Sequence, residues 1–348
     1  MAELRRVEVT EPGITRRPLG TGFEYFDDDG VKVDDREVVE RIAELVIPPA
    51  WREVWICPYP MGHIQATGID AAGRKQYRYH SQWRERRDQE KFDGMLQFAR
   101  ALPRLRGAVA GDLTLKGLPR ERALACAVRL LDRGFFRVGG EGYAADNETY
   151  GLATMQRRHV TVTREGAIVF DYVAKSGKRR IQRVMDRDVC SVVTTLKRRR
   201  GGGDELLAYK RGKRWYDIRS EDINEYVKVH GGPYTAKDFR TWNATVLAAV
   251  ALAVSGPAAA RSPTVRKRAE TRAVKEVAGY LGNTPAVARA SYIDPRLFDR
   301  FEQGLTIGGA LVVLGDDGDI SEPQLMGAEA AVLGLLEEED SPMIEKVA

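Results

Sequence analysis

The chain has 348 residues, 43% hydrophobic and 30% charged, a composition typical of a globular protein with one or two domains. No apolar run reaches the roughly 18 residues of a membrane span, and no signal peptide opens the chain, so we expect a cytoplasmic protein. The net charge of +5 is uneven: ten acidic residues and one basic residue follow from Asp316 onward, which leaves +14 on residues 1–315. Such a basic body favours a polyanionic partner.

The first 85 residues are predicted to be rich in short strands. Runs with strand-like composition are separated by Gly, Pro and Asp turn signals, and they lie at 23–27, 52–58, 63–70 and 75–80. One amphipathic helix, at 35–45, interrupts them. From about residue 82 the spacing of apolar residues becomes helical, which predicts a domain boundary at 82–90.

The second part is predicted to be mainly helical. Apolar residues at helical spacing predict helices at 83–102, 118–134, 186–199, 220–230, 235–254 and 263–282. Three strands, at 159–163, 167–174 and 179–185, are joined by the short turns REG and KSGK and predict an antiparallel element. We therefore expect an α+β protein with a β-rich N-terminal DNA-binding domain (1–85), a larger helical catalytic domain (86–310) and an acidic, solvated C-terminal tail (311–348).

Three segments of the second part carry basic residues in positions that suggest chemistry. Arg137 opens a glycine-rich turn. Its spacing matches no phosphate-loop motif, so by itself the segment is better explained as an ordinary turn. Lys175 is expected at a hairpin tip, either as a solvated base or on a finger that reaches DNA. Lys237 and Arg240 share a helix face, and Arg240, beside apolar neighbours, needs an anion that the sequence does not supply.

Two further residues complete an ordered set. Asn283 follows a predicted helix, and Tyr292 lies nine residues later, before an Asp-Pro stop. The apolar pattern does not require an aromatic residue at 292. The order Arg, Lys, Arg, Asn, Tyr, carried by RVG…NETYGL, YVAKSGK, KDFRTW and LGN…SYIDP, resembles the type IB DNA topoisomerases, particularly the short poxvirus-like form found in bacteria. With GRKQYRYH at 73–80, the resemblance spans about residues 20–305.

The resemblance implies relaxation of supercoiled duplex DNA without ATP, metal or another cofactor. Tyr292 would attack a phosphodiester and hold the cut strand as a 3′-phosphotyrosyl intermediate until religation. Arg137, Arg240 and Asn283 would bind the phosphate, Lys175 would be the general acid, and Lys237 would assist. Many members have histidine where Asn283 stands, so here the hydrogen-bonding role remains and an imidazolium role does not.

The expected partner is duplex DNA, bound mainly through its phosphates by a monomer that closes as a clamp and is associated with the nucleoid. Gln76, Tyr77 and Tyr79 lie in a strand-like segment and are candidate DNA contacts, although Tyr79 could instead face the core. Tyr143 and Asn147, within the glycine-rich segment, are two more candidates.

Two alternatives remain open from the sequence. A tyrosine recombinase would use the same tyrosine and arginines, but its middle helix carries HxxR where this chain has KxxR, from Lys237 to Arg240. A non-catalytic DNA-binding protein would account for the basic charge, and it would leave the order of the five residues as a coincidence.

Overall fold

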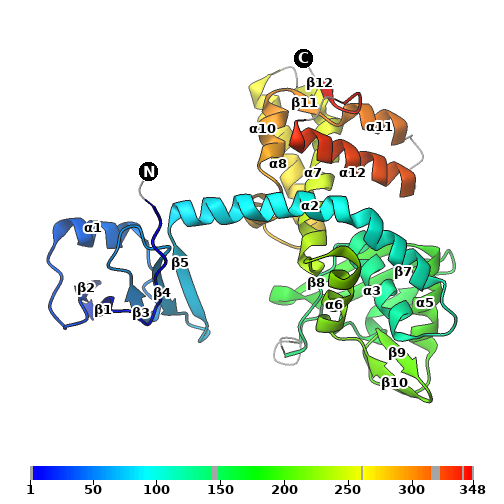
Figure 1. Ribbon diagram of the computed structural model, residues 1–348, viewed down its shortest axis with the longest axis horizontal. Helices are drawn as coiled ribbons and strands as arrows, with labels where there is room; N and C mark the ends of the chain where they lie inside the picture. Colours follow the sequence, from blue (N-terminus) through cyan, green and yellow to red (C-terminus); the bar gives the residue numbers. More distant parts are fainter. Residues whose placement is uncertain (1–2, 143–147, 260–261, 315–321, 339–340, 347–348) are drawn as a thin grey trace. The chain divides into compact units, whose positions relative to one another are not determined.

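The computed structural model describes residues 3–142, 148–259, 262–314, 322–338 and 341–346, with only the backbone at 257–259, 312–314 and 322–324 (Figure 1). It divides into two compact units, Met1–Phe92 and Asp93–Ala348. The division falls inside helix α2 (Ser81–Leu113), a few residues beyond the expected boundary at 85. Each unit has its own architecture.

The first unit is an antiparallel five-stranded sheet with one helix. In sheet order its strands are β2 (Gly22–Phe26), β1 (Ile14–Leu19), β3 (Arg52–Ile56), β4 (Ile64–Ile69) and β5 (Lys75–Tyr79). Helix α1 (Arg36–Glu44) begins where the Asp35 carboxylate accepts hydrogen bonds from two backbone N–H groups, and its Ile42 enters the core. The predicted strands and helix are confirmed. Strand β1, with sequence ITRRPL, lacked the apolar alternation that would have predicted it.

The second unit is mainly helical, as predicted. Its helices are α2, α3 (Arg120–Gly134), α5 (Arg187–Arg198), α6 (Ser220–Gly231), α7 (Ala236–Ala259), α8 (Pro263–Leu281), α9 (Pro285–Ser291), α10 (Arg296–Glu302), α11 (Gly308–Leu314) and α12 (Glu322–Glu337), with the short 3-10 turns η1 (Arg157–His159) and η2 (Lys175–Gly177). Helix α7 packs against α3, α6, α8, α10, α11 and α12. It is therefore the central element of this unit.

The predicted three-stranded element is present in the second unit. Strands β6 (Val160–Val162), β7 (Ala167–Ala174) and β8 (Lys178–Met185) pair in that order, all antiparallel, and α3 and α5 pack against them. Two further two-stranded sheets, which the sequence analysis did not predict, are β9 (Ala208–Arg211) with β10 (Arg214–Asp217) and β11 (Leu305–Thr306) with β12 (Glu345–Lys346).

The C-terminal segment differs from the expected solvated tail. Helix α12 packs against α7, α10 and α11, at the red end of the ribbon in Figure 1. Its apolar residues at 328, 331, 332, 335 and 336 follow helical spacing and are buried. The expectation of a solvated tail is therefore wrong for residues 322–337. It was based on the excess of acidic residues and did not take the spacing of the apolar residues into account.

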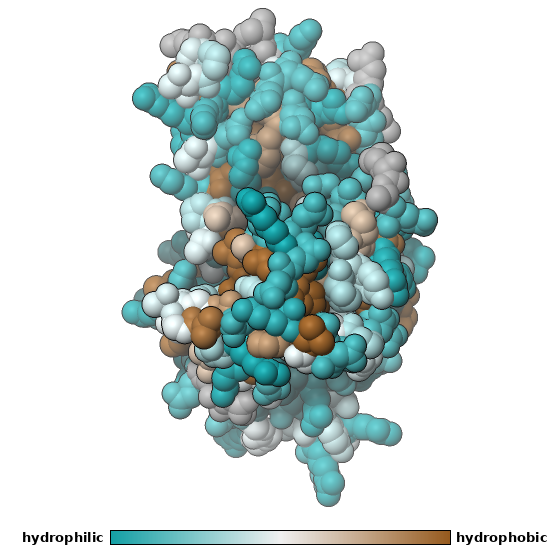
Figure 2. Space-filling model, turned by 90° about the vertical axis from the view of Figure 1, so that its left-hand side faces the viewer, coloured by the Kyte–Doolittle hydropathy of each residue, from teal (hydrophilic) through white to brown (hydrophobic). Residues whose placement is uncertain are grey.

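One face of the molecule is largely polar (Figure 2). Figure 2 shows one face of the molecule, on which hydrophilic residues predominate and small groups of hydrophobic residues lie between them. In the described ranges, no helix combines the length and hydropathy needed to cross a membrane.

Candidate active site

A pocket of about 470 Å³ in the second unit gathers most of the predicted catalytic residues. Its walls come from the loop after α3, the turn between β7 and β8, the first turns of α6 and α7, and the end of α9. Arg137, Lys175, Lys237, Arg240 and Tyr292 all line it. Segments that are about 155 residues apart in the chain thus meet at one place.

Arg240 is the most buried charged group of this pocket, with 3% of its surface exposed. Its Nη1 donates to the carbonyl of Phe135 at 2.5 Å, and its Nη2 donates to that of Leu281 at 3.0 Å. Neither bond neutralises the guanidinium charge. Burial, followed by repulsion from Arg137, lowers the pKa of Arg240 to about 10, so the group is still cationic near pH 7. The expectation that Arg240 is buried is confirmed.

Arg137 lies in a loop that two glycines make possible. Helix α3 ends at a left-handed Phe135, with φ of 53°, and the loop then crosses a second strand of chain at Gly139 and Gly151. A Cβ at Gly151 would lie 2.4 Å from the Cα of Gly139, so neither position admits a side chain. The carbonyl of Arg137 accepts a hydrogen bond from the amide of Leu152 at 2.8 Å, which fixes the loop. The glycine-rich segment therefore serves a close backbone crossing.

Asn283 is presented directly after α8. Gly282 ends that helix in the left-handed conformation, with φ of 66°. The Asn283 Oδ1 accepts a hydrogen bond from Arg137 Nη2. The Nδ2 of the same side chain is buried and has no hydrogen-bond partner among the described residues, and the same is true of Arg240 Nε. Buried donors of this kind are satisfied when an acceptor such as a phosphate oxygen binds.

Tyr292 follows the last turn of α9, with its phenol among the arginines. The phenol lies beside the guanidinium group of Arg240, whose Cζ is 5.3 Å from the ring centroid, and Arg137 lines the same pocket. Burial by itself would raise the pKa of the phenol, but the positive charges of Arg240 and Arg137 outweigh burial. The net pKa of Tyr292 is therefore below its ordinary value.

The two lysines are exposed at the rim of the pocket. Lys175 lies in η2, at the tip between β7 and β8, where Ser176 and Gly177 have φ of 67° and 70°. Lys237 lies in the first turn of α7, which is capped by Thr235 and Asp238.

The candidate DNA contacts in the first unit lie on β5. Tyr77 and Tyr79 are 41% and 38% exposed, and their rings stack with centroids 5.9 Å apart, so neither faces the core. Gln76 is half-buried, and its Nε2 donates to Asp70 at 2.9 Å. The remaining candidates, Tyr143 and Asn147, lie outside the described residues.

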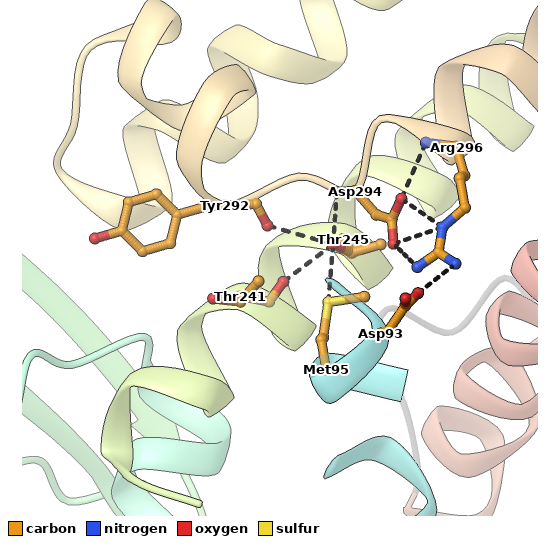
Figure 3. Close-up of polar contacts among 7 residues, drawn as sticks. All are labelled: Asp93, Met95, Thr241, Thr245, Tyr292, Asp294 and Arg296. Carbon is orange, nitrogen blue, oxygen red and sulfur yellow. Dashed lines mark hydrogen bonds and ion pairs between the residues drawn. The ribbon is translucent and has the colours of Figure 1, made fainter. Parts of the chain in front are cut away.

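Thr245, which no sequence pattern indicated, contacts the backbone of the tyrosine. Figure 3 shows its hydroxyl among the backbone carbonyls of Thr241 and Tyr292, the backbone amide of Asp294 and the sulfur of Met95. Beside it, Asp294 binds Arg296, which also reaches Asp93 on α2. A buried threonine in an Ala-rich helix gives no signal in the sequence.

Metal ligands do not gather in the part of the chain that the structure describes. In those ranges no three His, Cys, Asp or Glu side chains come together in an arrangement that could hold a metal ion.

Comparison with known proteins identifies the family. The family model "Eukaryotic DNA topoisomerase I, catalytic core" matches residues 80–303, and "Bacterial DNA topoisomerase IB, N-terminal domain" matches residues 22–70. The chain is 30% identical over 290 residues to a DNA topoisomerase 1B of Acanthamoeba polyphaga mimivirus, covering 81% of this chain and 85% of the viral protein. It is also 30% identical over 128 residues to a DNA topoisomerase 1 of Candidozyma auris, covering 36% of this chain and 16% of that protein.

These matches define the class of protein as an enzyme that changes DNA topology. The chain belongs to the type IB DNA topoisomerase family. The resemblance drawn from the sequence motifs is thereby confirmed, as is the α+β fold class with its β-rich N-terminal part and larger helical part.

Proposed function

We propose that the protein relaxes supercoiled duplex DNA without ATP or a metal ion. One strand would be cut by Tyr292, held as a 3′-phosphotyrosyl ester while the DNA rotates, and then rejoined. The observation that carries this proposal is the place of the Tyr292 phenol, beside Arg240 and in the pocket that Arg137 and Lys175 also line. A tyrosine nucleophile keeps the energy of the broken bond in the ester, so rejoining needs no external source.

Arg137, Arg240 and Asn283 would form the phosphate site. Two guanidinium groups suit the non-bridging oxygens of a phosphodiester, whose negative charge grows as the fifth oxygen approaches phosphorus. Asn283 Nδ2 and Arg240 Nε, which have no partner within the described ranges, would be further donors for those oxygens. Each donor held ready in such a site contributes on the order of 3 kcal/mol to transition-state stabilisation.

Lys175 would protonate the leaving group. As the bond between the Tyr292 oxygen and phosphorus forms, the bond to the 5′-oxygen of the next nucleotide breaks. The phenol loses one proton to solvent, and the 5′-oxygen gains one. Lys175, at the exposed tip of the hairpin, can approach that oxygen, and Lys237 lies on the same rim as an assisting cation.

Duplex DNA would be held by both units of a monomer that closes around it, and the protein would act in the nucleoid. The charge of +14 on residues 1–315 favours phosphate contacts throughout. On β5, the exposed Tyr77 and Tyr79 are available to phosphates or thymine methyl groups, and Gln76 is oriented by Asp70.

The first test is relaxation of negatively and positively supercoiled plasmid in EDTA without ATP, beside a Tyr292→Phe variant. We expect the wild type to relax both signs and to form a covalent adduct at the 3′ side of the nick after quenching with detergent. The variant removes one oxygen atom, so it should bind DNA like the wild type and form no adduct.

Two results would contradict the proposal. Adduct formation by Tyr292→Phe would mean that another residue is the nucleophile. A wild type that binds plasmid but neither relaxes nor nicks it would mean that the pocket does not perform this reaction.

A further inference from the structure

The backbone around Tyr292 is held from below by one side chain of α7. Thr245 is completely buried, and its hydroxyl lies 3.3 Å from the carbonyl oxygen of Tyr292. The same hydroxyl accepts a hydrogen bond from the backbone amide of Asp294 at 3.1 Å (Figure 3). One hydroxyl therefore contacts the chain on both sides of Ile293, which is itself fully buried.

The Thr245 hydroxyl cannot donate to all of its neighbours at the same time. A hydroxyl has one proton to donate and can accept through its lone pairs. The bond from Asp294 uses a lone pair and can persist. The single proton must be shared between the carbonyl of Thr241, at 3.0 Å, and that of Tyr292, with Met95 Sδ at 3.6 Å as a weaker acceptor.

We infer that Thr245 is a positioning residue, which fixes the backbone at 292–294 so that the phenol of Tyr292 stays in line with the phosphate site. The inference rests on the proposed role of Tyr292 as the nucleophile. Arg240, which contacts the phenol, lies on the same helix five residues earlier. Helix α7 thus contacts both the ring of Tyr292, through Arg240, and its backbone, through Thr245. Because the helix is rigid, it keeps the tyrosine at a fixed position relative to Arg240.

A second fixing point lies on the other side of the segment. Asp294 is fully buried, and its carboxylate pairs with Arg296 at 2.8 Å and accepts from the Arg296 amide at 2.9 Å. Arg296 in turn pairs with Asp93 at 3.0 Å. Without the Thr245 hydroxyl the segment would keep this anchor but lose the one directly under Tyr292, so the tyrosine would shift while the fold persists.

Three variants separate the hydroxyl from the methyl group of Thr245, and a fourth variant, at Thr195, is a control. Thr245→Val keeps the shape and removes the hydroxyl, while Thr245→Ser keeps the hydroxyl and removes the methyl group. Thr245→Ala removes both, so the Ser and Ala pair isolates the hydroxyl even if the Val variant does not fold. Thr195→Val is a matched control, because the Thr195 hydroxyl also bonds a carbonyl four residues earlier, that of Ser191, but lies exposed on α5.

Three quantities are measured: the single-turnover rate of covalent adduct formation on duplex DNA, the Kd for DNA, and the temperature of thermal unfolding. We expect Thr245→Val and Thr245→Ala to form adduct ~10²-fold more slowly than Thr245→Ser, with Kd unchanged within about twofold, because a misplacement of about 1 Å has that effect on rate. Thr245→Ser should react within about threefold of the wild type even if it unfolds at a lower temperature.

The inference is overturned if Thr245→Val, folded, reacts as fast as the wild type, or if Ser and Ala variants are slowed equally. A slowing by Thr195→Val of the same size would also overturn it. Tyr292→Phe is run in parallel: adduct formation by that variant would defeat the proposed function itself, whereas its absence together with a fast Thr245→Val would defeat the positioning role alone.

Discussion

At the tip of the β7–β8 hairpin, Lys175 projects from a turn in which the next two residues have left-handed backbones. Such a turn is tight, so the ammonium group is held near the rim of the pocket while remaining in contact with solvent. This suits a proton donor that must meet a DNA oxygen and later exchange its proton with water.

Replacing Lys175 by alanine should therefore slow cleavage by ~10²–10⁴-fold, the usual range for general acid catalysis. The loss should be largely restored by a substrate that carries sulfur in place of the 5′-oxygen at the scissile phosphate. A thiol has a pKa of about 8.5, so a thiolate leaves without a proton. Single-turnover cleavage of the two substrates measures the difference.

Tyr292→Phe is the control for that experiment and should cleave neither substrate. An equal loss on the oxygen and sulfur substrates in Lys175→Ala would show that the lysine has a role other than protonating the leaving group.

Asn283 shows how a neutral side chain can serve an anion site. Its Oδ1 is occupied by Arg137, which leaves Nδ2 directed as a donor. The amide orientation is thus fixed by the arginine, and under the proposed function the NH2 group would donate to a phosphate oxygen without adding charge.

Among the elements, α12 is joined to the rest of the second unit by a buried ion cluster. Arg106 of α2 donates to Asp132 of α3 and to Glu329 of α12, and Trp242 of α7 also donates to Glu329. Burial opposes the charge of Arg106, but the bonds to Glu329 and Asp132 outweigh it and raise the arginine pKa. The C-terminal helix is in this way tied to α3, whose end leads to Arg137.

Arg106→Met should destabilise the protein by about 3–5 kcal/mol, because it leaves two buried carboxylates facing each other without a cation. Glu329→Gln should cost less than about 2 kcal/mol, since Arg106 keeps Asp132 and the amide oxygen still accepts a hydrogen bond. Equilibrium urea unfolding of the full chain measures both. A Glu329→Gln variant less stable than Arg106→Met would contradict this account.

The elements differ in how well the sequence predicts them. Apolar periodicity was enough for the long helices and for β7, where buried residues alternate along the strand. Strands β9 and β10 escaped prediction because AYKR and RWYD are mostly polar and exposed. In α12 a helical stripe of apolar residues is present, but the acidic residues around it favour a solvated tail when charge alone is considered.

For the whole molecule, the basic body should make DNA binding strongly dependent on salt. Each phosphate neutralised releases about 0.9 counterion, so a protein with about 6–10 such contacts loses ~10³-fold or more in affinity between 50 and 200 mM salt. Titration of Tyr292→Phe with a duplex at several salt concentrations gives the slope without cleavage. A slope close to zero would contradict binding through phosphates.

The site as a whole could be predicted only in part. Arg137, Lys175, Lys237, Arg240, Asn283 and Tyr292 were named from motif order, and the structure brings them to one pocket or into contact with its residues. The supporting groups could not be named, because Thr245 and the carbonyls of Phe135 and Leu281 become neighbours only when α3, α7 and α8 pack. Packing geometry is a property of the fold, and no local pattern records it.

The end of α8, just before position 283, is held in place by hydrogen bonds to its backbone. The backbone there is held by Arg240 on the carbonyl of Leu281, by Arg180 on that of Tyr280 and by the amide of Asn283 on Ala278. None of these bonds involves the side chain at 283. A change from asparagine to histidine at 283 should therefore leave the end of α8 in place, and its effect would fall on the side-chain bond with Arg137.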